Sequence, residues 1–344
     1  MLEKVLNYYP VNNPRAILEI MVGLINQTYK IDTDEGSFIL QKLNPIFTPK
    51  SIEDVNAVSQ YLKSKELITQ EIIKTRNGKL WVEEKKEIWR LMTYIPGEVF
   101  TKIENPNIAY EAGKILGQFH HALADFKYNF RHHRIMHHAT EKHLKLFLKV
   151  IRSNEQEMRN NSDIENLKKT ILGLSKLLLP KNLRRTITHG DPKISNVIFR
   201  AIDRARIPIT QAIALIDLDD VGDHHSPLIE LGDAFRSWCG GYEDDPKNTF
   251  NLEKFMAALQ GYLEGSSNFL TKKELGLLPQ AIKLITLELA SRFLRDYFED
   301  CYFGWNPKKY TSRQAHNLAR TRGQVALYND ILKKDHEITF YAKN

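Results

Sequence analysis

The stretch THGDPKISNVIF, residues 188–199, brings an aspartate, a lysine and an asparagine close together. Asp191 follows a short apolar run and Asn196, five residues later, opens another, so a loop between two strands can turn both side chains toward one point. This is the geometry of a phosphoryl-transfer loop, in which the aspartate accepts the proton of an acceptor hydroxyl and the asparagine holds a metal ion. Lys193 would supply positive charge for the transferring phosphoryl group. We expect His189 to brace the loop rather than to act in catalysis.

A second acidic group follows the apolar run AIALIDL at residues 212–218. We expect this run to form a strand that delivers Asp217 at its end, with Asp219 on the same face if the strand continues. Mg²⁺ prefers oxygen ligands and bridges nucleotide phosphates, so Asn196, Asp217 and Asp219 are the expected metal ligands. The residues alone leave a second interpretation open, in which these side chains only cap turns. The presence of both motifs in one chain favours the catalytic interpretation.

Composition limits the classes of function. A chain of 344 residues with 42% hydrophobic residues can form two packed lobes with a cleft between them. The net charge is +7, but the basic residues are scattered, so we expect an anionic small ligand rather than a nucleic-acid partner. Cys239 and Cys301 are too few for a disulfide framework. Because no segment reads as an apolar leader or a membrane span, we expect a cytoplasmic protein without a membrane partner.

The residues that must position this loop fall into two regions. Residues 1–95 read as strands and hairpins, with runs at 24–31 and 37–43 joined by the turn DTDEG, then a helix capped near Thr48, then three further short strands. Residues 96–344 read mainly as amphipathic helices, interrupted by the short β-rich pieces TITH, NVIFR and QAIALIDLDD. We therefore predict an α+β fold with a small antiparallel β-sheet lobe that carries a helix and a larger, mainly helical lobe.

These motifs together resemble a known group of enzymes. THGDPKISNVIF followed by ALIDLDD is similar to the aminoglycoside phosphotransferase and choline kinase superfamily, whose two-lobed fold is like that of protein kinases. LMTYIPGEVF resembles the hinge between the lobes, and AGKILGQFHHAL resembles the first helix of the large lobe. Within the superfamily, GLINQTYKI, SFILQKLNP, RFLRDYFEDCYF and HNLARTRGQ most resemble the N-acetylhexosamine 1-kinases. Those enzymes use ATP to phosphorylate the anomeric hydroxyl of N-acetylated hexosamines.

The resemblance implies roles for single positions. Asp191 becomes the catalytic base, and Asn196 and Asp217 become magnesium ligands. The positions implied to cover the nucleotide phosphates or to meet adenine are Asn26, Gln27, Thr28, Met92, Thr93 and Tyr94.

One position departs from the pattern of the family. The third strand usually carries a basic residue that holds the α- and β-phosphates, and here that slot falls on Gln41 or Lys42. Neighbouring side chains of a strand point to opposite faces, so only one of the two can face the cleft. Glu53 on the following helix is a partner for Lys42 by the kinase pattern, and a solvated glutamate is an equal alternative.

A sugar acceptor needs planar polar groups and an aromatic platform. The sequence offers two candidate groups, with Asp233 and Arg236 in IELGDAFRSW and with Arg292, Asp296 and Tyr302 in the later helix. Arg292 and Asp296 are four residues apart and share a helix face, which fits an acceptor-binding pair or a surface ion pair equally well.

Histidines are clustered in two places. RHHRIMHHATEKH, residues 131–143, holds His133 and His137 at helical spacing, but no acidic residue accompanies them as in a metalloprotease motif. We therefore interpret this stretch as a solvated basic surface in preference to a metal site. His224 and His225 follow the acidic cluster and could approach phosphate or metal, although a polar loop also explains them.

The sequence thus predicts an ATP- and Mg²⁺-dependent small-molecule kinase that transfers the γ-phosphoryl group to a sugar hydroxyl. The favoured acceptor is the anomeric hydroxyl of an N-acetylhexosamine, with Asp191 as the base. The alternatives are another acceptor, such as an aminoglycoside, a choline-like amino alcohol or another sugar, and a catalytically silent nucleotide-binding module with a kinase fold. Intact Asp191, Asn196 and Asp217 favour the enzyme. No oligomeric state is predicted.

Overall fold

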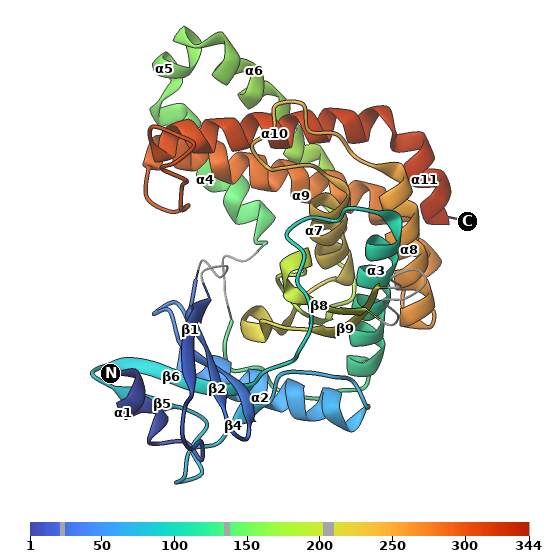
Figure 1. The fold of residues 1–344 in the computed structure, drawn as a ribbon. Helices are drawn as coiled ribbons and strands as arrows, with labels where there is room; N and C mark the ends of the chain where they lie inside the picture. The colour runs from blue at the N-terminus through green and yellow to red at the C-terminus, as the bar shows by residue number, and fades with distance from the viewer. Residues whose placement is uncertain (21–24, 134–137, 202–209, 344) are drawn as a thin grey trace.

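Two lobes make up the molecule, a β-rich one at the bottom of Figure 1 and a larger helical one above it. The computed structural model describes residues 1–20, 25–133, 138–201 and 210–343. A small antiparallel sheet and a larger helical part confirm the predicted α+β class. The boundary predicted at residue 95 falls between the last strand of the sheet and the first long helix, and it stays a prediction.

One antiparallel sheet forms the base of the small lobe. Its strand order is β1-β2-β3-β6-β4, and β5 also pairs with β6. The predicted hairpin is present as β2 and β3, where Gly36 takes a φ of +137° in the turn. The predicted start of its first strand, at residue 24, lies outside the described residues. The elements of this lobe are α1 (Leu2–Leu6), β1 (Ala16–Ile20), β2 (Gln27–Thr33), β3 (Gly36–Lys42), α2 (Pro49–Ser64), β4 (Ile72–Ile73), β5 (Val82–Glu84) and β6 (Glu87–Thr93).

The sheet is covered by a helix on each face because its strands alternate buried apolar side chains. Ile31 and Leu40 pack with Val5 of α1 in one cluster. Ile39 and Met92 belong to the opposite cluster, which includes the apolar residues of α2 and continues into the large lobe. The sheet face that looks toward the large lobe is therefore the one that α2 and Met92 share.

Two turns shape the small lobe after α2. Lys85 and Lys86 have φ values of 52° and 66°, the backbone that a two-residue hairpin turn between β5 and β6 requires. Gly78 turns the chain with φ +78°, but β4 and β5 pair with β6 instead of with each other. The reason is that β6 is long enough to pair with both short strands, which leaves it buried at the centre.

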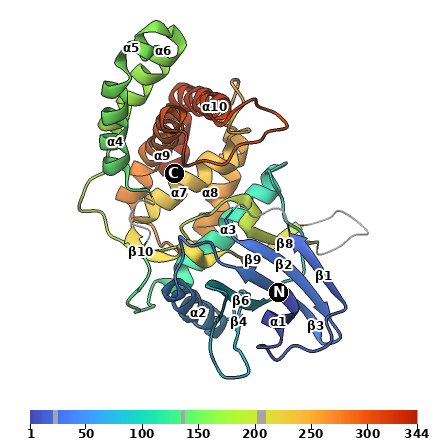
Figure 2. The ribbon, with the colours of Figure 1, turned by 90° about the vertical axis from the view of Figure 1, so that its left-hand side faces the viewer.

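The large lobe consists mainly of helices, with two short strand pairs on the side that faces the sheet (Figures 1 and 2). None of the described helices is long and apolar enough to cross a membrane. The strand pairs are β7 (Thr186–Thr188) with β10 (Gly222–His225), and β8 (Val197–Ala201) with β9 (Thr210–Leu215). The helices are α3 (Pro106–Leu123), α4 (Thr140–Ser153), α5 (Glu155–Asn160), α6 (Ser162–Ile171), α7 (Pro227–Cys239), α8 (Leu252–Ser266), α9 (Lys272–Glu299), α10 (Arg313–Lys333) and α11 (Asp335–Lys343), with the short 3-10 turn η1 (Leu172–Leu177).

The helices α3 and α8 approach so closely that their backbones touch. Gly113 and Gly117 of α3 face Gly261 and Gly265 of α8, and a Cβ added at Gly113 would lie 2.0 Å from the carbonyl oxygen of Ala258. Asn105 caps the start of α3, because its side chain accepts a hydrogen bond from the Ile108 amide. α3 of this tight pair also packs against β9 and β7.

Candidate active site

Two loops lie side by side at the junction of the lobes because their flanking strands pair. The first runs from the end of β7 to the start of β8, and the second runs from the end of β9 to the start of β10. β7 pairs with β10 and β8 pairs with β9, so both loops are held at both ends. The Ile216 amide also donates to the Asn196 carbonyl at 2.9 Å, which joins the loops directly.

His189 is fully buried and braces the first loop, as expected. Its Nε2 lies 2.9 Å from the carbonyl of Ile216, and its Nδ1 accepts from the Asp191 amide at 3.3 Å. These partners require the tautomer that carries its proton on Nε2. The imidazole therefore fixes loop geometry and has no nitrogen left for chemistry.

Gly190 is held by a buried network that was absent from the predictions. Its amide donates to Glu230 Oε1 at 2.7 Å, and Glu230 Oε2 lies 2.5 Å from Nε2 of His120. His120 in turn contacts the hydroxyl of Tyr262 at 2.8 Å. Burial opposes the charge of Glu230, but His120 outweighs burial and lowers the pKa of this carboxyl. The sequence held one indication of this network. Glu230 in IELGD and His120 in QFHHAL are polar residues on the apolar faces of their helices.

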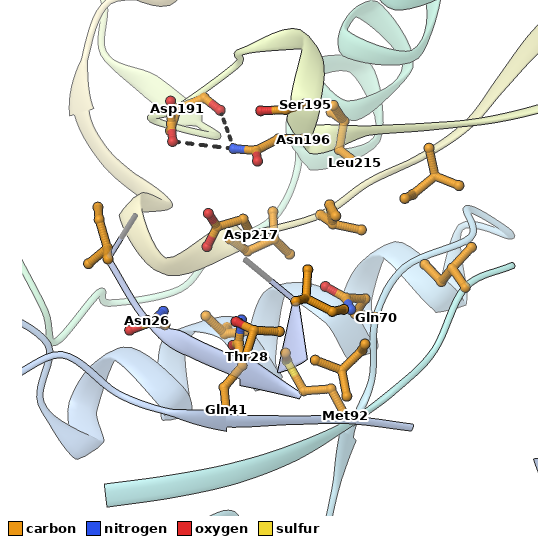
Figure 3. Close-up of a pocket in the computed structure, with 18 of the residues that line it drawn as sticks. Asn26, Thr28, Gln41, Gln70, Met92, Asp191, Ser195, Asn196, Leu215 and Asp217 are labelled. Carbon is orange, nitrogen blue, oxygen red and sulfur yellow. Dashed lines mark hydrogen bonds between the residues drawn. The ribbon is translucent and has the colours of Figure 1, made fainter. Parts of the chain in front are cut away.

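The predicted catalytic side chains meet in the first loop (Figure 3). Lys193 Nζ lies 2.5 Å from Asp191 Oδ2. Asn196 Nδ2 donates to the backbone carbonyl of Asp191 at 2.8 Å and lies 3.3 Å from Oδ2 of Asp191. Because the amide nitrogen is used in this way, Asn196 Oδ1 is the atom able to bind a cation. Burial opposes the charge of Lys193, but Asp191 and Asp217 outweigh burial and raise its pKa.

Trp238 supports the same loop from α7. Its Nε1 donates to the Pro192 carbonyl at 2.8 Å, and the indole is buried. Trp238 packs and hydrogen-bonds beneath the loop.

Asp217 lies in the second loop, across the cavity from Asp191 in Figure 3. Its backbone is left-handed, with φ 67° and ψ 56°, a conformation that costs free energy for a residue other than glycine. Burial, with Asp219 adding to its effect, raises the pKa of Asp217 to about 7. A buried carboxylate without a full counter-charge is suited to a cation.

Asp219 corrects one prediction. The strand β9 ends at Leu215, and Asp219 lies in the short turn that follows, so the strand does not continue through Asp217 and Asp219 as expected. Its two oxygens lie 2.5 and 2.9 Å from Nη1 and Nη2 of Arg90, and Oδ2 also accepts from Asn26 at 2.7 Å. Asp219 therefore joins the lobes, and because Arg90 and Asn26 occupy its oxygens, the geometry favours Asp217 over Asp219 as a metal ligand. Its neighbour Asp220 lines the cavity instead.

Arg90 is the buried cation of this site, and it was absent from the predictions. Alternation on β3 turns Gln41 into the cavity, where its Oε1 accepts from Nε and Nη2 of Arg90 at 3.0 and 2.6 Å. Lys42 points the other way and pairs with Glu87 at 2.9 Å, so its predicted nucleotide contact is wrong. Glu53 pairs with Arg131 at 2.6 Å and not with Lys42. Gln41 and Arg90 are opposite each other in the pairing of β3 with β6. Only this strand register places Arg90 at the site, and the sequence alone does not give the register.

The remaining nucleotide positions divide by strand alternation. Asn26, Thr28, Met92 and Tyr94 line a cavity of about 360 Å³ between the lobes. Gln27 lies outside that wall and is exposed. Thr93 also lies outside, where its amide donates to the Glu71 carbonyl at 2.9 Å and its hydroxyl accepts from the Glu71 amide at 3.0 Å. Gln27 and Thr93 therefore do not line the cavity, and their nucleotide contacts stay predictions.

We call this space the inter-lobe cavity. It has an apolar end and a polar end. Both lobes contribute to its wall, as Figure 3 shows for the small lobe below and the catalytic loops above. The apolar end includes Ile39, Val55, Met92, Ile95, Ile198 and Leu215, and the polar end includes Gln41, Arg90, Asp191, Lys193, Asn196, Asp217 and Asp220. A flat heterocycle and an anionic chain fit these two ends.

The predicted acceptor residues form two groups in the large lobe. Asp233 Oδ1 accepts from Arg236 Nε and Nη2 at 3.1 and 2.8 Å, and both side chains are largely buried. The guanidinium of Arg292 lies 5.8 Å from the ring centre of Tyr302, which is 54% exposed. Arg292 Nη1 is 3.9 Å from Glu288, so its acidic neighbour is not Asp296.

Asp296 does not act as predicted. It is fully buried and accepts hydrogen bonds from the backbone amides of Cys301, Tyr302 and Phe303 at 2.9–3.0 Å and from Asn317 at 2.8 Å. These bonds consume both oxygens, so Asp296 neither touches an acceptor nor forms a surface ion pair with Arg292. It fixes the loop that carries Tyr302.

A comparison with known families agrees with this geometry. The model of the Phosphotransferase enzyme family matches residues 16–264, more than two thirds of the chain. The chain belongs to this family. It is a small-molecule kinase that transfers a phosphoryl group to a hydroxyl, and the use of ATP and Mg²⁺ is consistent with the family.

Solved structures share the fold of this phosphotransferase at low sequence identity. The microcompartment-associated aminopropanol kinase has a TM-score of 0.70 at 17% identity, with 97% of each chain covered. Amicoumacin kinase hAmiN, in complex with AMP-PNP, Ca²⁺ and Ami, has a TM-score of 0.62 at 16% identity, with 94% of this chain and 92% of that chain covered. Choline kinase from Cryptosporidium parvum Iowa II has a TM-score of 0.57 at 15% identity, with 100% and 99% covered.

The donor set of the phosphotransferase fits a magnesium ion. Asn196 Oδ1 and the Asp217 carboxylate are oxygen ligands of the kind Mg²⁺ takes, and Asp217 is buried with a raised pKa. Arg90 already compensates Asp219, which leaves Asp217 as the carboxylate in need of a cation. These residues can hold the metal that accompanies ATP.

Proposed function

We propose that this phosphotransferase binds MgATP in the inter-lobe cavity and phosphorylates a hydroxyl of a neutral sugar, with the anomeric hydroxyl of an N-acetylhexosamine as the favoured acceptor. The observation that carries the proposal is the meeting of Asp191, Lys193, Asn196 and Asp217 at the polar end of this cavity. Residues 1–95 would then hold the nucleotide, and residues 96–344 would supply the catalytic loop and the acceptor site.

The two ends of the cavity support the orientation of the nucleotide. Adenine would lie among Ile39, Met92 and Leu215, where burial of an aromatic ring is favourable. The phosphates would then reach Arg90 and Lys193, and Arg90 would take the place of a basic residue on β3, where Gln41 and not Lys42 faces the cavity. Asn196 and Asp217 would hold the metal ion, which would offset the negative charge of the phosphates.

The chain's own residues would organise the transfer. Asp191 accepts the proton of the attacking hydroxyl, because it is the partly exposed carboxylate of the loop, and Asn196 fixes the backbone at Asp191. Lys193, beside Asp191, stabilises charge on the transferring phosphoryl group. His189, Gly190 and Trp238 hold the loop so that this geometry exists before substrate binds.

Charge balance around the predicted acceptor residues supports a neutral acceptor. Asp233 is paired with Arg236, and Glu288 is paired with His138 and Arg292. A cationic acceptor such as choline or an aminoglycoside needs an unbalanced carboxylate or an aromatic cage, and the described carboxylates of this group are balanced. Exposed Tyr302 beside Arg292 offers an apolar face for a sugar ring.

The proposal can be tested by incubating the protein with MgATP and a panel of acceptors while ADP release is followed. The panel contains N-acetylhexosamines, free hexoses, choline, an aminopropanol and an aminoglycoside, and the product is located by phosphorus NMR. We expect the highest kcat/KM with an N-acetylhexosamine and a phosphate on the anomeric carbon. Turnover with only choline or only the aminoglycoside would refute the assignment of an N-acetylhexosamine as acceptor. Turnover by the Asp191→Asn variant equal to that of the wild type would refute the role of Asp191 as base.

A further inference from the structure

We propose that His133, Asp223 and His224 form a binding site for one divalent transition-metal ion, separate from the nucleotide-metal position at Asp217. The three residues come from two segments far apart in the sequence. His133 belongs to the histidine stretch, and Asp223 and His224 belong to the strand β10. One ligand atom from each lies within 4.8 Å of the other two. The acidic residue of the trio thus comes from β10 and not from the histidine stretch.

The chemistry of this trio matches a transition metal better than magnesium. Two imidazoles and one carboxylate are the ligands of open three-residue sites for Zn²⁺ and related ions, whereas Mg²⁺ takes oxygen ligands. With metal–nitrogen bonds of about 2.0–2.1 Å, tetrahedral ligand atoms lie about 3.4 Å apart. His133 and Asp223 are exposed, so small rotations of their side chains can close the present spacing.

His224 gives an independent sign that a ligand is expected here. Both of its ring nitrogens are buried, and neither has a hydrogen-bond partner among the described residues. Buried polar atoms without partners are rare, because their desolvation is then uncompensated. The rings around His224 are those of His133 and His225, with centres at 6.1 and 4.2 Å. A metal ion between His133 and His224 would satisfy one of these nitrogens.

The position of the site gives the ion a structural role. Asp54 of α2 is buried and accepts from the backbone amides of Arg131 and His132 at 2.8–3.1 Å, so the stretch before His133 is attached to the small lobe. His224 and Asp223 lie on β10, which pairs with β7, the strand that leads into the catalytic loop. An ion at this point would therefore join α2 of the small lobe to the strand pair beneath the catalytic loop.

Metal binding to the full-length protein tests the proposal directly. Protein stripped with a chelator is titrated with Zn²⁺ by calorimetry in excess Mg²⁺, and Co²⁺ is used for its absorption spectrum. We expect one ion per chain and an increase in Tm. His133→Gln and Asp223→Asn change exposed residues and should leave the fold intact while weakening Zn²⁺ binding by at least about tenfold. His121→Gln, an exposed histidine at the end of α3, is the matched control and should bind as the wild type does.

An Asp217→Asn variant separates the two metal positions. It should still bind Zn²⁺ with the wild-type affinity, whatever happens to its kinase activity. Loss of Zn²⁺ binding in Asp217→Asn together with unchanged binding in Asp223→Asn would overturn the proposal, because the ion would then occupy the nucleotide site. Equal affinity in all variants, or no saturable binding in the wild type, would also overturn it.

Discussion

At the scale of single residues, Asp217 combines backbone strain with an unfavourable buried charge. Its φ of 67° is tolerated best by glycine, asparagine and aspartate, and its carboxyl lies in a buried position near Asp219 and Asp191. Neither feature helps the protein to fold. Both are understandable if the side chain is held in readiness for a cation, since strain of this kind persists where the surrounding structure enforces it.

The Asp217→Asn variant should therefore separate stability from activity. Asparagine accepts the left-handed backbone and removes one of the neighbouring buried carboxylates, so we expect a Tm equal to or above that of the wild type. Loss of the metal-binding charge should lower kcat by about 10³-fold, which corresponds to about 4 kcal/mol of transition-state stabilisation. Thermal unfolding and steady-state kinetics measure the two effects. A destabilised variant with near-normal kcat would contradict this view of Asp217.

At the scale of elements, the close pair of α3 and α8 holds the network that supports the catalytic loop. His120 on α3 contacts Tyr262 on α8 and Glu230 on α7, and Glu230 holds Gly190. The glycines at 113, 117, 261 and 265 set the separation of α3 and α8. Helix packing distance is thereby linked to the position of the catalytic loop.

A methyl group at the helix contact should disturb this arrangement. In Gly113→Ala the new Cβ would lie 2.0 Å from a backbone carbonyl oxygen, which cannot move without separating the helices. We expect a loss of about 1–3 kcal/mol in the free energy of unfolding. Gly173→Ala is the control, because its Cβ would meet only a side-chain methyl at 3.9 Å. Urea unfolding of the two variants compares the costs, and similar stabilities would show that α3 and α8 can adjust.

A second contact between elements should make stability depend on pH. His138 faces Glu288, Asp233, Arg292 and His225. Burial opposes the charge of His138, but Glu288 outweighs burial and raises the pKa of the imidazole. Burial opposes the charge of Glu288 as well, yet the hydrogen bond with His138 lowers the pKa of this carboxyl to about 2.

The signs of the two shifts define the pH window. The raised pKa of His138 contributes stability below its ordinary value of 6.5, and this contribution is lost as the pH rises through the folded value. The lowered pKa of Glu288 contributes stability above 4.5, and this is lost as the pH falls toward 2. The contact between His138 and Glu288 should therefore stabilise the folded protein most between pH 4.5 and 6.5. Urea unfolding of wild type and His138→Gln on both sides of pH 6.5 measures it, and parallel profiles would contradict the assignment.

At the scale of the whole molecule, Arg90, Asp219 and Asn26 join the lobes across the inter-lobe cavity. Arg90 and Asn26 belong to the small lobe and Asp219 to the large lobe, and the Arg90–Asp219 pair is almost completely buried. A buried ion pair contributes little net stability, but removal of one partner leaves an expensive isolated charge. The pair therefore fixes the relative position of the lobes more than it stabilises either one.

A double-mutant cycle tests this connection. Arg90→Met and Asp219→Asn should each cost about 3–5 kcal/mol in the free energy of unfolding, while the double variant should cost far less than their sum. Arg90→Met should also raise KM for ATP if Arg90 contacts phosphate, whereas Lys42→Met should leave KM unchanged because Lys42 lies outside the cavity. Additive costs in the cycle would show that the two residues do not act as a pair.

Much of the site could be read from sequence because its signals are local. Asp191, Lys193 and Asn196 lie on one loop, and a loop between two short strands has few ways to arrange them. The strand that delivers Asp217 is marked by its own apolar run. In the same way, the apolar periods of α2 and α3 and the turn at Gly36 were sufficient to predict the two lobes.

Other parts of the site depended on which strands become neighbours. Strand alternation predicted that the side chains of Gln41 and Lys42 point to opposite faces of the sheet. Only the pairing of β3 with β6 placed Arg90 beside Gln41. The turn after β9 brings Asp219 to Arg90, and hydrogen bonds to the loop after α9 make Asp296 the residue that fixes this loop.

The sequence by itself determined which polar residues share the loop after β7 and the class of fold, since both rest on the order and spacing of nearby residues. Only the tertiary structure decided that the Arg90 side chain lies at the cavity and pairs with the Asp219 carboxylate. It also decided that His133 lies near Asp223 and His224. The physical reason is that charge pairing and ligand sets depend on distances of a few ångströms between segments far apart in the chain. Local periodicity carries no information about those distances until the lobes have packed.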